Sequence, residues 1–254
     1  NHILLLPTGP EELYQLTMES FDLAERYQTP VFVMTDLDMG MNLWVSDRFE
    51  YPPNAFDRGK VLDADALKQV EEFARYKDVD GDGVPYRTLP GTRHPKAPYF
   101  TRGSGHTETA DYTEDSEEYR VVIDRIKRKI DSSVAHTPKP VIEGEGDVGI
   151  IHYGSTSFAV DEARDRLAAD GMTTRSLRIR ALPLHDEVLE FVQSCRVVYV
   201  VEQNRDGQVA DIIRLKVPGS AMKIRKVLHY DGLPLACDVV EAALVAGERE
   251  PVHA

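Results

Sequence analysis

The amino-acid sequence predicts an α/β protein with two parallel-sheet units and a long irregular connection between them. Short apolar runs alternate with amphipathic stretches near both ends of the chain, which is the pattern of strands and helices in a parallel sheet. Between about residues 46 and 146 this alternation gives way to irregular sequence rich in Pro and Gly. At 254 residues, the chain is long enough for one large domain or two modest ones, and we expect two.

The first unit reads as a strand, a helix and a second strand. Residues 3–6 are an uninterrupted apolar run, as in a strand buried on both faces. Thr8 and Glu11 match a capping box, so we expect a helix to start there and to end before Pro30. A second buried strand should follow at 31–35, and the sequence DLDMGMN at 36–42 should leave it as a loop.

A strand at the third residue is an unusual start for a parallel sheet, which needs neighbouring strands and helices on both faces. We therefore expect residues 1–45 to be the closing part of a domain that is truncated at its start. The alternative is a small domain that begins naturally at this point.

The middle of the chain, residues 46–146, is expected to be a linker that contains two helices, at 63–76 and 117–130. The stretch 77–114 between those helices is longer than an ordinary connection. Irregular segments of that length are usually functional, or they wrap around a partner.

Residues 147–254 should form a parallel α/β domain, because strands and helices alternate strictly along this region. The predicted strands are 149–153, 175–179, 197–201 and 227–230, and the predicted helices are 157–168, 185–194, 208–216 and 235–246.

The net charge and the lengths of the apolar runs argue against some classes of partner and some cellular locations. The net charge of −13 argues against nucleic-acid binding, which draws on clustered Lys and Arg. No apolar run approaches the roughly 18 to 20 residues that a membrane helix needs. The short run at 3–6 lacks the basic flank of an export signal, so we expect a cytoplasmic protein.

The two cysteines, Cys195 and Cys237, lie within apolar patterns and should be buried core residues. They imply no disulfide framework. An iron-sulfur cluster needs four thiolates, so the chain alone cannot hold one. Any electron transfer would need a partner.

The most informative candidate binding residues follow the second predicted strand. Asp36, Asp38 and Asn42 lie at the carboxyl end of a buried parallel strand, where ligands of α/β sheets usually bind. Structural capping of the loop by the two aspartates is an equally good interpretation. The turn HYGSTS at 152–157 could in principle cradle an anion with its amides, although an ordinary strand-to-helix turn is the favoured interpretation.

The sequence DVDGDG at 78–83 places Asp78, Asp80 and Asp82 at alternate positions, as at the start of an EF-hand calcium loop. The twelfth position is Leu89, where such a loop needs a bidentate Glu, and a tight polar turn explains the same residues. A metal site at these carboxylates is the less favoured of the two hypotheses.

His106 and Arg93 are candidate catalytic residues, because polar side chains gather around them in the long middle segment. A solvated surface explains the same composition equally well. No nucleophile elbow, P-loop or dinucleotide fingerprint occurs in the sequence.

Several segments together resemble the alpha subunit of 2-oxoacid:ferredoxin oxidoreductases. Residues 4–44, LLLPTGPEELYQLTMESFDLAERYQTPVFVMTDLDMGMNLW, look like the closing half of that family's pyrimidine-binding thiamine diphosphate domain. The sequences YKDVDGDGVPYRTLPGT and TEDSEEYRVVIDRIKRKID are similar to the linker of the 2-oxoglutarate-type branch. VVYVVEQNRDGQVADIIRL resembles the family's transketolase C-terminal-like domain.

The resemblance implies oxidative decarboxylation of a 2-oxoacid, 2-oxoglutarate for this branch, to an acyl-CoA, with electrons passing to ferredoxin. It implies a beta subunit as partner in an alpha-beta hetero-oligomer. In the family that partner mainly holds thiamine diphosphate, its Mg²⁺ ion and a [4Fe-4S] cluster, so this chain alone would hold no cofactor and would be inactive.

The sequence departs from the family pattern in two places. The substrate loop and the glutamate that activates the aminopyrimidine belong to the earlier half of the pyrimidine domain and are not found here. The family's linker often reads Gly-x-Glu-His-Asp, whereas Gly103 to Thr107 is GSGHT, so His106 matches without its acidic neighbours.

Two alternatives remain open. The chain could be a non-catalytic structural or interaction module of such a complex. It could also be the C-terminal region of another thiamine enzyme, of the transketolase or branched-chain dehydrogenase type, although the long DGDG linker argues against this.

Overall fold

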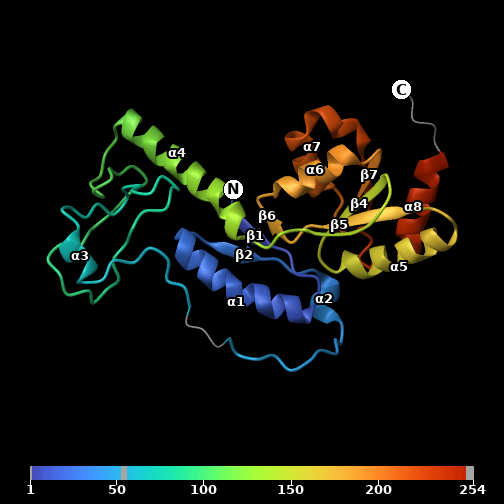
Figure 1. Cartoon of the computed structure of the whole chain (residues 1–254), viewed down its shortest axis with the longest axis horizontal. Helices are drawn as coiled ribbons and strands as arrows, with labels where there is room; N and C mark the ends of the chain where they lie inside the picture. Colours follow the sequence, from blue (N-terminus) through green and yellow to red (C-terminus); the bar gives the residue numbers. More distant parts are fainter. Residues whose placement is uncertain (1, 53–55, 250–254) are drawn as a thin grey trace. The chain divides into compact units, whose positions relative to one another are not determined.

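The computed structural model describes residues 2–52 and 56–249 (Figure 1). Its elements form two compact units, each assembled from separate parts of the chain. The sheet unit comprises residues 4–17, 33–50 and 138–254, and the connector unit comprises residues 1–3, 18–32 and 51–137.

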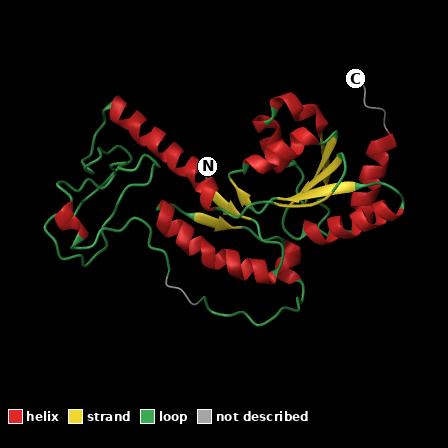
Figure 2. Ribbon diagram, viewed as in Figure 1, coloured by secondary structure: helices red, strands yellow, loops and turns green. Residues whose placement is uncertain are grey.

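The sheet unit is built on a five-stranded sheet, drawn in yellow in Figure 2. Its strand order is β3-β5-β4-β7-β8. β4, β5, β7 and β8 are parallel, and β3 is an antiparallel edge strand. The bounds are β3 (Val141–Gly144), β4 (Val148–His152), β5 (Thr174–Arg178), β7 (Val197–Glu202) and β8 (Ile224–Leu228). The four predicted strands are therefore confirmed, within a few residues at their ends.

Helices cover both faces of this sheet because β4 and β7 are buried along their whole length and are largely apolar up to the last residue of each, His152 and Glu202. The helices are α5 (Thr156–Ala169), α6 (Asp186–Ser194), α7 (Gln208–Lys216) and α8 (Cys237–Arg249), with a 3₁₀ helix η2 (Pro218–Lys223) before β8. All four α-helices were predicted from sequence.

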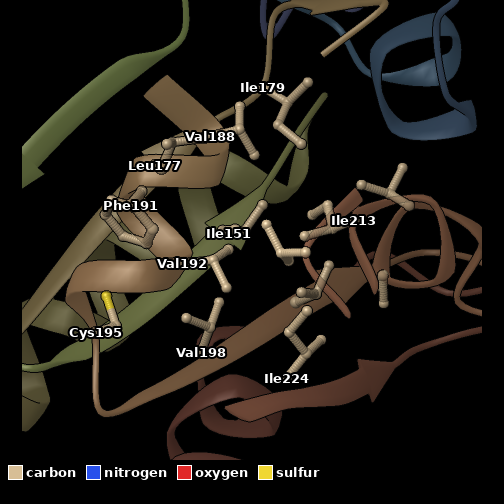
Figure 3. Close-up of a cluster of buried hydrophobic side chains, with 14 of the residues drawn as sticks. Ile151, Leu177, Ile179, Val188, Phe191, Val192, Cys195, Val198, Ile213 and Ile224 are labelled. Atoms are coloured by element: carbon tan, nitrogen blue, oxygen red, sulfur yellow. The ribbon is translucent and has the colours of Figure 1, made fainter. Parts of the chain in front are cut away.

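Two hydrophobic clusters hold the layers together. Figure 3 shows the first, in which α6 and α7 pack on the sheet through side chains such as Phe191 and Ile213. In the second, α5 and α8 pack on the other face through Leu167 and Leu244. Cys195 lies in the first cluster and Cys237 in the second, and both are buried free thiols, as predicted.

A second, three-stranded sheet has the order β2-β1-β6, with β1 (Ile3–Leu5), β2 (Val31–Val33) and β6 (Ala181–Leu182). β6 pairs antiparallel with β1, placing Leu4 opposite Leu182. β3 and β6 were not predicted, because β3 is a largely exposed edge strand and β6 has only two residues, so neither carries a periodic apolar pattern.

The first long helix, α1 (Pro10–Tyr27), has a different start from the predicted capping box. The side chain of Glu12, not Glu11, accepts the Thr8 amide at 2.9 Å. The Thr8 hydroxyl donates to the Gly154 carbonyl at 2.9 Å, so it does not cap the helix. Thr8 therefore bonds to Gly154, a distant residue of the sheet unit, and does not complete the capping box with Glu11.

The connector unit is mostly irregular and contains α3 (Ala66–Gln69), α4 (Ser116–Ser132) and the 3₁₀ helix η1 (Ser133–His136). α4 confirms the predicted helix at 117–130. The predicted helix at 63–76 is wrong outside α3. Residues distant in the sequence form hydrogen bonds with backbone groups that the helix would need. Lys96 Nζ donates to the Val70 carbonyl at 2.5 Å, and the Tyr76 amide donates to Glu108 O at 2.9 Å. Among the described helices, none is long and apolar enough to span a membrane.

Candidate functional site

The segment that follows β2 is a helix and not the predicted loop. Asp36 caps α2 (Leu37–Met41), because its Oδ1 accepts the Met39 amide at 2.9 Å. At the other end, the Asn42 amide donates to Asp38 O at 3.1 Å. The sequence signal for this short helix was the aspartate N-cap itself, which the loop prediction passed over.

Asp36 and Asp38 also bind the turn that follows β4. Asp36 Oδ2 accepts the Ser155 amide at 2.8 Å, and the Ser155 hydroxyl donates to Asp38 Oδ2 at 3.3 Å. Gly154 has a φ of +62°, and a Cβ there would lie 2.7 Å from Asp36 Oδ2. The HYGSTS turn therefore does bind an anionic group through an amide, and that group is the chain's own carboxylate.

A buried carboxylate organises the neighbouring turn after β7. Glu202 is fully buried and accepts the Val209 and Ala210 amides at 3.0 and 2.9 Å, at the start of α7. It also accepts the Tyr153 hydroxyl at 3.2 Å and the Asn204 side-chain amide at 2.8 Å. Burial, together with the Glu202 charge, raises the pKa of Tyr153, so this phenol stays protonated.

Sequence reasoning missed Glu202. The available signal was a carboxylate placed directly after the apolar run VVYVV, where a charge can persist only if it is hydrogen-bonded. His152 is also fully enclosed, and its Nδ1 lies 3.3 Å from Ser157 Oγ. Burial, with the charges of Arg178 and Arg164, lowers its pKa to about 3. His152 is therefore a neutral core residue.

Two neighbouring pockets open at the carboxyl ends of the strands of the sheet unit, beside α2. One has a volume of about 490 Å³, and six polar residues are part of its lining: Asp36, Asp38, Gln203, Asn204, Gln208 and His229. The other has a volume of about 720 Å³ and is lined largely by apolar side chains: Leu37, Met41, Trp44, Phe158, Ala159 and Leu235. Leu37, Asp38 and Gly232 line both pockets. Ligands of parallel α/β sheets bind at this edge.

Most polar groups of this edge already bond to one another. Gln203 Nε2 donates to Ser155 Oγ at 3.0 Å, and His229 Nε2 pairs with Asp231 at 3.1 Å. These polar side chains are thus held in place by one another. They are not free groups that point toward a substrate.

The predicted site residues Asp78, Asp80 and Asp82 form a polar turn in the connector unit. Lys60 Nζ lies 2.7 Å from Asp80 and 2.8 Å from Asp82. Burial alone would lower the pKa of Lys60, but hydrogen bonds to the two carboxylates raise it above its usual value. Within the described residues, no group of three or more His, Cys, Asp or Glu side chains is arranged to hold a metal ion.

The two candidate catalytic residues of the middle segment, Arg93 and His106, belong to the connector unit, whereas the residues that line the two pockets belong to the sheet unit. His106 stacks on Tyr76 with ring centroids 3.8 Å apart, and its Nδ1 lies 3.2 Å from Thr107 O. The Arg93 side chain is exposed. The structure thus gives His106 a packing contact, and Asp36, Asp38 and Asn42 a shared position around α2.

We expect Asp36→Asn to destabilise the sheet unit by about 1 kcal/mol, because an amide side chain can accept only one of the two backbone bonds. Urea unfolding followed by circular dichroism measures this change. Asp47→Asn is the matched control, since Asp47 is exposed, and it should leave the unfolding midpoint unchanged. Equal midpoints for the two variants would contradict the assignment of Asp36 as a cap.

No family model matches the chain. Curated relatives nevertheless align with almost all of it. The 2-oxoacid:ferredoxin oxidoreductase 2 subunit alpha of Aeropyrum pernix is 28% identical over 98% of this chain and 39% of its own length. The 2-oxoglutarate synthase subunit KorA of Archaeoglobus fulgidus is 25% identical over 97% of this chain and 61% of its own length. The corresponding KorA subunit of Methanocaldococcus jannaschii is 26% identical over 82% of this chain.

Among solved structures, the 2-oxoglutarate:ferredoxin oxidoreductase of Magnetococcus marinus superposes with a TM-score of 0.82 at 24% identity. The superposition covers 96% of this chain and 42% of that one, so the two share their fold. The chain spans 39% and 61% of the length of the first two relatives. Over nearly its whole length, this chain is a homologue of 2-oxoacid:ferredoxin oxidoreductase alpha subunits.

Proposed function

We propose that the chain is the C-terminal part of the alpha subunit of a thiamine diphosphate-dependent 2-oxoacid:ferredoxin oxidoreductase that acts on 2-oxoglutarate. The observation that carries this proposal is the alignment of 98% of the chain with a named alpha subunit. Two relatives named as 2-oxoglutarate synthase subunits support 2-oxoglutarate as the substrate. The reaction is oxidative decarboxylation to an acyl-CoA, with electrons passing to ferredoxin.

Thiamine diphosphate, when bound to the holoenzyme, supplies the carbanion chemistry. The chain's own contribution is positional. Asp36 and Asp38 fix the Ser155 turn, and Glu202 fixes the start of α7, so the wall around the two pockets is preorganised. We propose that the apolar pocket, lined by Trp44 and Phe158, excludes water from the cofactor's organic ring.

The residues of this chain do not fit the remaining cofactors. A [4Fe-4S] cluster needs four thiolates, whereas the sequence has two cysteines, each buried in a different hydrophobic cluster. Both oxygens of Asp36 already accept backbone amides, so they are poor ligands for Mg²⁺. We therefore assign the cluster and the Mg²⁺-diphosphate to a beta subunit, in a cytoplasmic alpha-beta hetero-oligomer.

The decisive assay uses the full-length alpha chain purified with its beta partner. We expect coenzyme A-dependent reduction of ferredoxin or methyl viologen with 2-oxoglutarate, and at least about 10-fold less with pyruvate or 2-oxoisovalerate, because a second carboxylate is read by polar contacts. Faster reduction with another 2-oxoacid would overturn the substrate assignment. No reduction with any 2-oxoacid would overturn the function itself.

A second function, as a non-catalytic structural module, is favoured by one observation: the polar groups at the pocket edge are satisfied by one another. A calorimetric titration of this chain alone with thiamine diphosphate and Mg²⁺ tests whether the chain binds the cofactor by itself. We expect no measurable binding by the isolated chain and full activity only in the complex. Tight binding by this chain alone would contradict the assignment of the Mg²⁺-diphosphate to a beta subunit.

A further inference from the structure

The connector unit contains a group of cationic side chains on one side of α4. Arg125 and Lys129 are four residues apart, so they share one face of the helix. Arg125 is only 7% exposed, and Lys129 and Arg75 are partly buried. Like charges held close together with little water repel one another, and an anion among them would lower the energy of the group.

Gln28 accepts a hydrogen bond from each of two of these cations, Arg75 and Lys129. Its side-chain oxygen accepts from Arg75 Nη2 at 2.7 Å, and its main-chain oxygen accepts from Lys129 Nζ at 3.3 Å. The contact to the amine is long for a hydrogen bond, so the ammonium is weakly compensated.

Arg75 has donors without an acceptor. Its Nε and Nη1 atoms are buried and have no hydrogen-bond partner among the described residues. The guanidinium lies over the rings of Tyr76 and Tyr99, 4.8 and 5.5 Å from their centroids. Stacking occupies the face of the guanidinium but leaves the N–H groups of Nε and Nη1 unsatisfied, and these groups match the oxygens of a carboxylate.

The nearby carboxylates of the connector unit are already engaged. Both oxygens of Asp78 accept the Gly83 amide at 3.0 Å, and Arg128 lies 3.1 Å from the same side chain. Asp80 and Asp82 bind Lys60. The excess positive charge around Lys129 therefore persists within the described part of the unit.

The same surroundings make the Lys129 amine nucleophilic. Burial, together with the charges of Arg125 and Arg75, lowers its pKa from 10.5 to about 8. About a tenth of this amine is then uncharged at pH 7, compared with less than about one in a thousand for an ordinary lysine.

We propose that Nζ of Lys129 reacts reversibly with carbon dioxide and that Arg75 and Arg125 bind the resulting carbamate. The ammonium first releases one proton to solvent. The lone pair of the uncharged amine then forms an N–C bond, one C–O π pair moves onto oxygen, and Nζ releases a second proton to solvent. Nothing is oxidised or reduced. The group carries a negative charge where it carried a positive one, so repulsion within the cluster becomes attraction.

This inference does not depend on the proposed function, because dissolved carbon dioxide is sufficient. The proposed reaction would nevertheless release carbon dioxide, so the modification would report on turnover. A carbamate has the planar geometry of a carboxylate, which suits the fork of a guanidinium.

The test traps the carbamate. The chain is incubated with bicarbonate at pH 8, treated with a trialkyloxonium salt that esterifies carbamates, digested and analysed by mass spectrometry. Lys127 is the matched control on the same helix, because its side chain is 72% exposed and it pairs with Asp131. We expect at least about 10-fold more trapped ester at Lys129 than at Lys127, since carbamates form from the uncharged amine.

A second measurement separates covalent modification from simple anion binding. Carbon dioxide at fixed pH and ionic strength should raise the melting temperature of the wild-type chain, and Lys129→Arg should abolish this rise because arginine stays protonated. No ester at Lys129, or equal ester at Lys127, overturns the proposal. A rise that persists in Lys129→Arg also overturns it, because bicarbonate would then be bound without a covalent bond.

Discussion

Replacing Glu202 with Ala should destabilise the sheet unit by about 3–5 kcal/mol, or prevent it from folding, because four donors lose a fully buried charged acceptor. The Val209 and Ala210 amides at the start of α7 would lose their partner, and the Tyr153 and Asn204 side chains would lose theirs. Chemical unfolding followed by far-ultraviolet circular dichroism measures the change.

Two further variants keep this prediction testable if Glu202→Ala does not fold. Glu202→Gln retains one acceptor oxygen and should lose less stability than Glu202→Ala. Glu190→Ala removes an exposed glutamate from α6, and it should change stability by less than about 0.5 kcal/mol. A Glu202→Ala protein as stable as Glu190→Ala would show that the buried network contributes nothing.

Replacing Lys129 with Met should stabilise the connector unit by about 2 kcal/mol at pH 7, measured in buffer free of carbon dioxide. The lowered pKa of about 8 means that the folded state disfavours the charged amine. The full shift corresponds to about 3 kcal/mol, which we reduce because the amine keeps some contact with water.

The pH dependence identifies the cause. Between pH 8 and 10.5 the unfolded chain keeps the Lys129 proton while the folded chain releases it, so wild-type stability should rise with pH across that window. The advantage of Lys129→Met should therefore be constant below pH 8 and should vanish near pH 10.5. Lys127→Met, at an exposed position on the same helix, should show no such crossover. An advantage that does not change with pH would indicate better apolar packing and no electrostatic effect.

Elements with a strong apolar period were predicted well. α7 was predicted at 208–216, the bounds it has in the structure, because its apolar side chains face the sheet at helical spacing. β7 was predicted because an uninterrupted apolar run leaves few alternatives to a strand buried on both faces.

The errors arose where tertiary partners compete with local preference. Residues 70–76 have a helical pattern, yet Lys96 and Glu108 take backbone groups that a helix would need. Glu11 matches the capping box, yet Glu12 bonds to Thr8 because Arg178 and Arg180 hold its carboxylate, at 2.7 and 2.6 Å. Charged side chains from distant parts of the sequence decided these positions.

In the candidate site, too, the sequence predicted where residues lie, and tertiary contacts set their partners. The position of Asp36 and Asp38 after a buried strand was enough to select them, since the carboxyl edge of a parallel sheet is a general property of the fold. Their partner Ser155 lies more than a hundred residues away, and Glu202 acts through amides of the following helix. Neither contact is visible in a local pattern.

Apolar periodicity and residue order are properties of the chain, so they were enough to predict the alternation of strands and helices in the sheet unit, the burial of both cysteines and the likeness to an alpha subunit. The roles of the polar residues depend instead on contacts between distant parts of the chain. Asp36 holds a turn, Asp80 and Asp82 bind Lys60, and Lys129 lies among arginines. The reason is physical: a carboxylate or an amine bonds to whichever group the fold brings within about 3 Å, and that neighbour is set by packing across the whole unit.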